Sequence, residues 1–190
     1  MIIESLTLSN FRCFGLGPTS VHFANSVTSF IGGNGAGKTA ALSGLARLFG
    51  ITRKQRSIVK SDFHIARGSG SLADGAELYI EAILAFPELV AGDGAANAPA
   101  PAVAEFWRQM AASADGAALK VRIRLKARWV DDGTPDGAIE EDIRWITRLD
   151  DGFVWDDCQK VTSTDRATVQ MIYVPAMRRA EDQVLSLIHI

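Results

Sequence analysis

The sequence predicts an α/β protein in which a phosphate-binding loop joins a strand to a helix, beside a mainly antiparallel β region. Residues 27–31 are rich in β-branched and aromatic side chains, which favours a strand. They run into the glycine cluster GGNGAGKT at residues 32–39. Across residues 40–49, apolar side chains recur at the spacing of a helix that buries one face. A strand, the pattern Gly-x-x-x-x-Gly-Lys-Thr and a helix, in this order, are the context of a P-loop.

The residue types in this loop suit the binding of a nucleotide's phosphates. Glycine permits backbone conformations that a Cβ forbids, and it lets the backbone approach a phosphate closely. Successive N–H groups and the N-terminus of the next helix then form an anion-binding site. Lys38 is the expected catalytic residue, because it would reach the β- and γ-phosphates, and the Thr39 hydroxyl is the expected metal ligand, for Mg²⁺. The expected nucleotide-binding residues are Gly32, Gly33, Asn34, Gly35, Ala36, Gly37, Lys38 and Thr39. The alternative is a glycine-rich turn that ends in a lysine, and the flanking strand and helix argue against it.

Composition narrows the remaining possibilities. The chain has 190 residues with 20 basic and 22 acidic side chains, so its overall charge gives no sign of nucleic-acid binding. Two cysteines, Cys13 and Cys158, lack the spacing of a metal or redox motif and favour a reducing compartment. The N-terminus lacks the pattern of a secretory signal, and no apolar stretch is long enough to cross a membrane. We therefore expect a cytoplasmic protein without a membrane partner.

The first fifty residues resemble a known type of ATPase. Alternating apolar side chains predict a strand over residues 2–9 and a short second strand near Val21 and Phe23. The pattern Ile-x-x-Leu-x-Leu-x-Asn-Phe-Arg at residues 3–12, followed by the P-loop, resembles the start of an SMC/RecF-type ABC ATPase head. The later sequence YVPAMR, at residues 173–178, resembles the OLD (overcoming lysogenisation defect) family. Members of that family join an N-terminal ABC-type ATPase to a C-terminal Toprim nuclease.

This resemblance implies a function for the complete protein. ATP and Mg²⁺ would be its cofactors, and an OLD-like protein would hydrolyse ATP and cut DNA as an ATP-dependent endonuclease. Two heads would enclose ATP as a homodimer, each supplying a signature motif to the other's nucleotide. The resemblance also implies that Arg12 lies near the adenine and phosphates. The alternative, which stays open, is that Phe11 fills the core while Arg12 is solvated.

The region of residues 77–155 is predicted to be largely antiparallel β structure. Strict alternation of apolar and polar residues and turn-forming clusters support this prediction. The expected elements, in order, are a strand over 77–86, a low-complexity connector over 91–101, a helix near 102–113, a strand over 119–130, a turn at 131–137, a returning strand over 139–149 and a short strand within 150–157. A more uniformly apolar strand is expected over 169–174. In ABC-type heads such a strand leads to the Q-loop, but the expected glutamine is absent at its exit.

Three charged segments allow a functional and a structural interpretation. The strand over 119–130 has five basic side chains on one face, which could bind a phosphate backbone. We favour pairing with acidic side chains of the returning strand. The acidic residues of 150–157 could hold a metal ion, but their turn positions favour solvated loop acids. The basic cluster over 52–56 could contact DNA, although a solvated surface turn is favoured because no aromatic residues interleave its charges.

The chain is expected to be the N-terminal part of a longer protein. Residues 1–184 would form the N-terminal part of an ABC-type ATPase domain, with its P-loop core in residues 1–50. The signature motif, the Walker B strand and the switch histidine of such heads would follow this region, so we expect turnover below about 1 per second from this chain alone. The ending LSLIHI, at residues 185–190, matches one reading frame of a transposon-derived sequencing adapter. Other codons for these residues in the nucleotide sequence would exclude that origin.

Other functional classes remain as alternatives. One is an SMC/RecF-like DNA repair ATPase without a nuclease, and another is a fragment that binds without catalysis. A small P-loop kinase or GTPase would need a base-specificity motif such as Asn-Lys-x-Asp or an arginine-bearing lid. Neither motif is evident, and the extensive antiparallel strands argue against this class.

Overall fold

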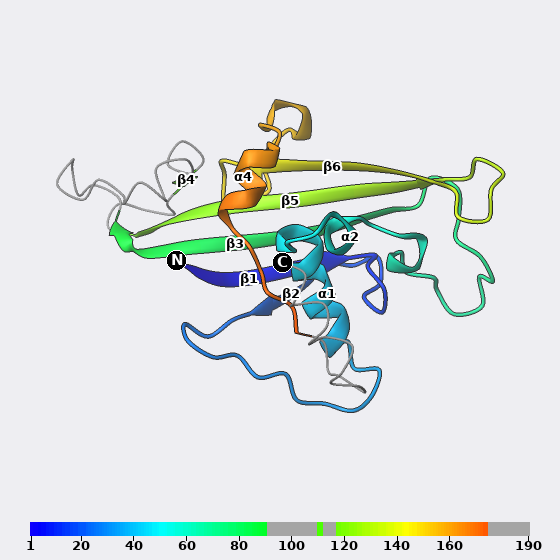
Figure 1. Ribbon diagram of the computed structural model, residues 1–190, viewed down its shortest axis with the longest axis horizontal. Coiled ribbons are helices and arrows are strands. Elements are labelled where there is room, and N and C mark those ends of the chain that lie inside the picture. The colour runs from blue at the N-terminus through cyan, green and yellow to red at the C-terminus, as the bar shows by residue number, and fades with distance from the viewer. Residues whose placement is uncertain (91–109, 112–116, 175–190) are drawn as a thin grey trace, which may run out of the picture.

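A six-stranded antiparallel sheet dominates the structure (Figure 1). The structure is a computed structural model that describes residues 1–90, 110–111 and 117–174. The strands are β1 (Ile2–Ser9), β2 (Thr19–His22), β3 (Glu77–Val90), β4 (Met110–Ala111), β5 (Ala118–Val130) and β6 (Ala138–Ile146). In the described ranges, the helices are α1 (Lys38–Phe49), α2 (Arg53–Arg56) and α4 (Ser163–Thr168), with two short 3-10 helices, η1 (Lys60–Asp62) and η4 (Trp155–Asp157). The order across the sheet is β2-β1-β3-β5-β4, and β6 pairs with β5 on the same edge as β4.

The alternation along β5 determines which face of the sheet is buried. Side chains on successive strand residues point to opposite faces, so residues with odd numbers share one face. The odd-numbered apolar residues of β5 are buried, namely Val121, Ile123, Leu125, Ala127 and Trp129. Leu125 lies opposite Ile80 of β3 and Ile143 of β6, and thereby continues this apolar layer across three strands. The strands predicted over 2–9, 77–86 and 119–130 are therefore confirmed.

Helix α1 packs against this apolar layer through a close approach to β1. A Cβ added to Gly44 would lie 2.7 Å from Cδ2 of Leu8, which is fully buried. Because Gly44 has no side chain, the helix comes closer to β1 than a larger residue would allow. Leu45, Leu48 and Phe49 then complete the buried face of the helix. The predicted helix after the P-loop is confirmed, and it ends at Phe49 as expected.

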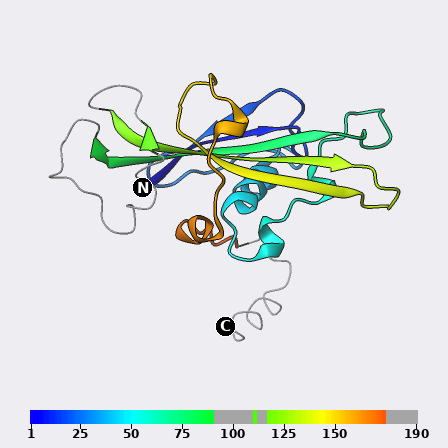
Figure 2. The same ribbon diagram turned by 90° about the horizontal axis from the view of Figure 1, so that it is seen from above.

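Helix α1 lies on one side of the sheet, and the segment that follows β6 crosses the other side (Figure 2). On β5, the even-numbered residues from 120 to 128 point away from the apolar layer and are all basic. Arg122 and Arg124 both donate from Nε to Oε2 of Glu81 on β3, at 2.8 and 2.7 Å. Lys120 pairs with Glu4 of β1, also at 2.8 Å. Charge pairing across strands is confirmed, but these acidic partners lie on β3 and β1 and not on the returning strand. The register of β5 and β6 explains part of this difference between predicted and observed partners. It places Arg144 of β6, and not an acidic residue, opposite Arg124.

The acidic segment after β6 covers this charged face. Asp151 accepts a hydrogen bond from Nη2 of Arg122 at 2.7 Å, and this bond lowers the pKa of the Asp151 carboxyl. Asp150 accepts from Arg148, which lowers its pKa in the same way. The Phe153 ring lies beside the guanidinium group of Arg122, 5.2 Å from ring centroid to Cζ. Within the described residues, no group of three or more His, Cys, Asp or Glu could hold a metal ion.

Two predicted strands do not form. Residues 27–31 run as irregular chain between β2 and α1, with Val27 and Ile31 exposed at 74% and 95%. Residues 169–174 make a single parallel bridge, between Met171 and Gly50, and are otherwise irregular. A strand is stable only where its backbone N–H and C=O groups find a ladder partner. In the described part of the chain, neither segment has a neighbouring strand that could supply that ladder.

Two smaller predictions also need correction. The short strand predicted within residues 150–157 does not form, because the chain there bends through η4. Most of the helix predicted over 102–113 lies outside the described residues, as does the whole connector 91–101. The described part, Met110–Ala111, is strand β4, which pairs with Val121 and Lys120. Its apolar residues therefore extend the edge of the sheet and do not belong to a helix there.

The Glu81 pairing gives a test of the charged face. Arg122→Gln would leave Glu81 and Asp151 short of a cation at a position where the Arg122 side chain is only 4% exposed. We expect the free energy of unfolding in urea to fall by about 3 kcal/mol. Arg128→Gln, at an exposed position on the same strand, is the control and should change it by less than about 0.5 kcal/mol. Equal stability of the two variants would contradict a structural role for this pair.

Candidate nucleotide-binding site

The predicted P-loop has the backbone conformations that its glycines permit. Gly35 and Gly37 have φ angles of 82° and 89°, in the left-handed region that favours glycine. Residues 31–36 are exposed, so a ligand can reach their N–H groups. Gly37 is the N-cap of α1, and no side chain caps this helix end. The N–H groups of the first turn therefore remain free to bind an anion.

Lys38 closes the loop onto itself. Its Nζ donates to the carbonyl oxygens of Gly32 and Gly33, both at 2.7 Å. The ammonium group thus lies against the glycine-rich loop. Phosphate oxygens could replace these neutral acceptors, because charge-assisted hydrogen bonds are about twice as strong. Thr39, the next residue of α1, is exposed, as a metal-binding hydroxyl would need to be.

The bend that follows β1, residues 10–16, contacts the end of this loop, and we call it the corner. A Cβ built on Gly37 would lie 3.1 Å from Cζ of Phe14 and 3.2 Å from Sγ of Cys13. A side chain at position 37 would therefore crowd Phe14 and Cys13, and the φ angle of 89° itself favours glycine. The corner is itself bent, since Asn10 and Arg12 both have positive φ angles, of 54° and 52°.

A buried carboxylate fixes this corner to α1. Asp62 is 0% exposed and accepts from Nε of Arg12 at 2.9 Å and from Nε of Arg47 at 2.8 Å. Nη1 of Arg12 also donates to Oγ of Ser43 at 2.8 Å, and Ser43 donates to the Thr39 carbonyl. Arg12 thus forms an ion pair with Asp62 of η1 and a hydrogen bond with Ser43 of α1, so it is not merely solvated. Phe11 is fully buried, as the structural alternative expected.

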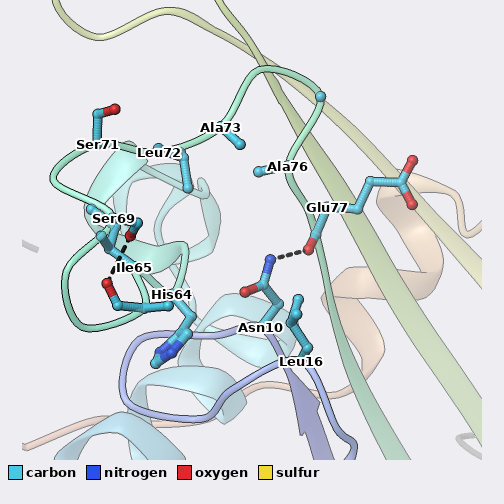
Figure 3. A pocket seen from close by; sticks show the side chains of 12 residues that line it. Asn10, Leu16, His64, Ile65, Ser69, Ser71, Leu72, Ala73, Ala76 and Glu77 are labelled. Carbon is cyan, nitrogen blue, oxygen red and sulfur yellow. Dashed lines mark hydrogen bonds between the residues drawn. The ribbon is translucent and has the colours of Figure 1, made fainter.

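A pocket of about 480 Å³ is lined in part by the same corner (Figure 3). Asn10 and Leu16 of the corner form one part of its lining, and His64 and Leu72 of the segment after η1 form another. His64 is held by a hydrogen bond of 2.6 Å between its Nδ1 and the Arg12 carbonyl. Sequence reasoning missed this pocket, because its residues show no motif and only the folded corner brings them together.

Comparisons with known proteins agree with this geometry. Residues 1–85 match the AAA ATPase domain family. A solved structure, reported for ATP-driven dimerisation and DNA-stimulated activation of SMC ATPases, aligns over 98% of both chains with a TM-score of 0.54 and 15% identity. The chain has the fold of an SMC-type ATPase head. A likeness at this identity establishes the fold, and the P-loop lies within the part that matches the ATPase family.

Two further SMC heads align over parts of their chains. One is an Smc head bound to the C-terminal winged-helix domain of ScpA, with a TM-score of 0.47, 19% identity and coverage of 78% of this chain and 36% of the other. The second is the Smc head domain with an extended coiled coil, bound to the C-terminal domain of ScpA from Pyrococcus furiosus. It has a TM-score of 0.46, 20% identity and coverage of 77% and 29%. No curated protein matches the chain. None of the helices in the described part of this chain has the length and apolar character needed to cross a membrane.

The Asp62 ion pairs provide a test of how the corner is held. Asp62→Ala would leave Arg12 and Arg47 without their shared carboxylate. We expect a loss of about 3 kcal/mol in the free energy of unfolding, measured in urea. Asp136→Ala, at an exposed turn position, is the matched control and should cost less than about 0.5 kcal/mol. A variant at position 62 as stable as this control would show that the pairing does not hold the corner.

Proposed function

We propose that residues 32–39 of this SMC-type head bind ATP together with Mg²⁺, and that the complete head hydrolyses ATP. The observation that carries this proposal is the uncapped N-terminus of α1 next to an exposed, glycine-rich loop that already contains the Lys38 ammonium. These groups form an anion site in which backbone and side chain both supply positive charge. The triphosphate of a nucleotide has the charge and the size for such a site.

Each residue would have a distinct role in the bound state. The N–H groups of residues 33–39 would surround the β-phosphate, and Lys38 would leave its loop carbonyls to contact the β- and γ-phosphates. The Thr39 hydroxyl would hold Mg²⁺, which supplies charge neutralisation between the phosphates. Asn34 would lie beside the γ-phosphate. Arg12 would act through Ser43 and Asp62, because these contacts position the corner against α1.

A second part of the proposal concerns the binding partners and the activity of the complete protein. We propose that two heads form a homodimer around ATP and that DNA is a partner of the complete protein. The related SMC structure, reported for ATP-driven dimerisation and DNA-stimulated activation, supports both points at the level of a shared fold. The OLD-like endonuclease proposal rests on the resemblance at residues 173–178. An SMC/RecF-like repair ATPase without nuclease activity is the alternative.

Lys38→Ala tests the nucleotide site directly. Loss of the ammonium group should weaken the binding of a fluorescent ATP analogue with Mg²⁺ by about 100-fold, because several charge-assisted hydrogen bonds disappear. Lys54→Ala, at an exposed position outside the loop, should bind like the original chain. Unchanged affinity at position 38 would refute the site. Competition by GTP stronger than by ATP would instead favour the GTPase class.

Gly37→Ala tests the geometry of the loop without removing a charge. The added Cβ would meet Phe14 and Cys13 and would strain a φ angle of 89°. We expect nucleotide affinity to fall at least tenfold, because the loop must shift away from its anion-binding shape. Gly17→Ala is the control, since nothing lies within 4 Å of its Cβ position and its φ angle is not positive. Isothermal titration with ATP and Mg²⁺ would measure both variants, and equal affinities would contradict this reading of the loop.

A further inference from the structure

A second basic site lies away from the P-loop, in a pocket between α2, β6 and α4. The pocket has a volume of about 530 Å³. Residues 159–161 build it by pairing with β6, through the bonds from Trp145 N to Gln159 O and from Val161 N to Ile143 O. This pairing places α4 near α2, although the two helices are far apart in the sequence. We name this pocket the arginine pocket, after Arg53, Arg56 and Arg166 in its lining.

The charges in the arginine pocket do not balance. Among the described residues, three guanidinium groups share the pocket with one carboxylate, that of Glu141. That carboxylate is partly engaged, since its Oε1 accepts from the backbone N–H of Ile58 at 2.8 Å. Burial lowers the pKa of Arg166, and repulsion from Arg56 lowers it further. Within the part of the chain that the structure describes, the pocket therefore holds more cations than anions.

The hydrogen bonds of the three arginines show which groups are available. Arg56 donates from Nη1 to the carbonyls of Gly50 and Ile51, and Arg166 donates from Nη2 to the Arg47 carbonyl. These bonds stabilise the C-terminal end of α1, which is one structural role for both residues. They leave the Nε of Arg166 buried without an acceptor among the described residues. Arg53 is exposed, and its side chain makes no hydrogen bond or ion pair within the described part of the chain.

We propose that the arginine pocket binds a phosphate group. A planar guanidinium presents several N–H donors that match the oxygens of a phosphate, and three guanidinium groups among the described residues line this pocket. Ser163 in the same lining offers a hydroxyl group as a further donor. The phosphate could belong to a nucleic-acid backbone or to a free phosphorylated molecule. The site is separate from residues 32–39 and does not depend on the ATP proposal.

The phosphate proposal predicts opposite effects for the removal of a positive and of a negative charge from the pocket. We would titrate inorganic phosphate into the ¹⁵N-labelled chain and follow the Arg166 Nε–H signal, assigned by its loss in Arg166→Lys. All variants would carry Lys38→Ala, so that the P-loop contributes equally to each. Arg53→Gln should weaken phosphate binding about three- to tenfold, since it removes a charge-assisted contact. Glu141→Gln should strengthen it about threefold, because the competing negative charge is gone while Oε1 can still accept from Ile58.

Arg67→Gln is the matched control, because Arg67 is an exposed arginine that lies outside the pocket lining. Arg53 is exposed in the same way, so neither substitution should impair folding, and urea unfolding would confirm this. Equal phosphate affinities for Arg53→Gln, Glu141→Gln and Arg67→Gln would overturn the proposal. No shift of the Arg166 Nε–H signal on titration would overturn it as well.

A second titration identifies the source of the phosphate. The probe is a fluorescein-labelled single-stranded DNA of 12 nucleotides, measured by anisotropy across a series of salt concentrations. If Arg53→Gln weakens DNA binding and lowers the log–log salt slope by about 1, the pocket binds nucleic-acid phosphate. If the variant changes only the affinity for inorganic phosphate, the pocket binds a free phosphorylated molecule. Both results support the phosphate site, and they assign it to different ligands.

Discussion

The buried carboxylate of Asp62 is the constraint on which the arrangement of the P-loop depends. It receives hydrogen bonds from Arg12 of the corner after β1 and from Arg47 of α1, and it also accepts from the Val59 N–H. A fully buried carboxylate is costly unless charged donors surround it, and here two guanidinium groups do so. The corner and the helix are therefore held in one relative position. Because the corner also contacts Gly37, the same ion pairs position the loop that would bind phosphate.

The sheet uses its two faces for different physical tasks. One face is apolar and packs against α1, where Gly44 allows the helix to approach Leu8. The other face carries arginines, and their charges are balanced by Glu81 and Asp151. Burial by itself would lower the pKa of Arg122, but its hydrogen bonds to these two acids raise it, so the residue stays charged. This face is consequently a closed ion network, which leaves few of the β5 charges for a nucleic acid.

Helix α1 connects the two candidate phosphate sites. Its N-terminus has free N–H groups next to the glycine loop, whereas its C-terminal carbonyls at Arg47 and Gly50 accept from Arg166 and Arg56. The first end favours an anion directly through the helix dipole. The second end collects cations because carbonyl groups attract them, and these cations then create the arginine pocket. Both ends of α1 thus contribute to a candidate anion site. The N-terminal end does so through its own N–H groups, and the C-terminal end does so through the arginines that its carbonyls bind.

Local patterns in the sequence determined those parts of the structure whose partners lie close by. The strict alternation of residues 119–130 and the apolar spacing of residues 40–49 correctly predicted β5 and α1, since burial of one face follows directly from periodicity. The glycine cluster likewise indicated the loop, because a positive φ angle at Gly35 and Gly37 needs this residue type. Only the tertiary structure decided what depends on distant partners. Residues 27–31 and 169–174 have strand-like sequences but lack a ladder neighbour in the described chain. Asp62 and Arg166 gained their roles from groups that the fold brings together, and no local pattern encodes such contacts.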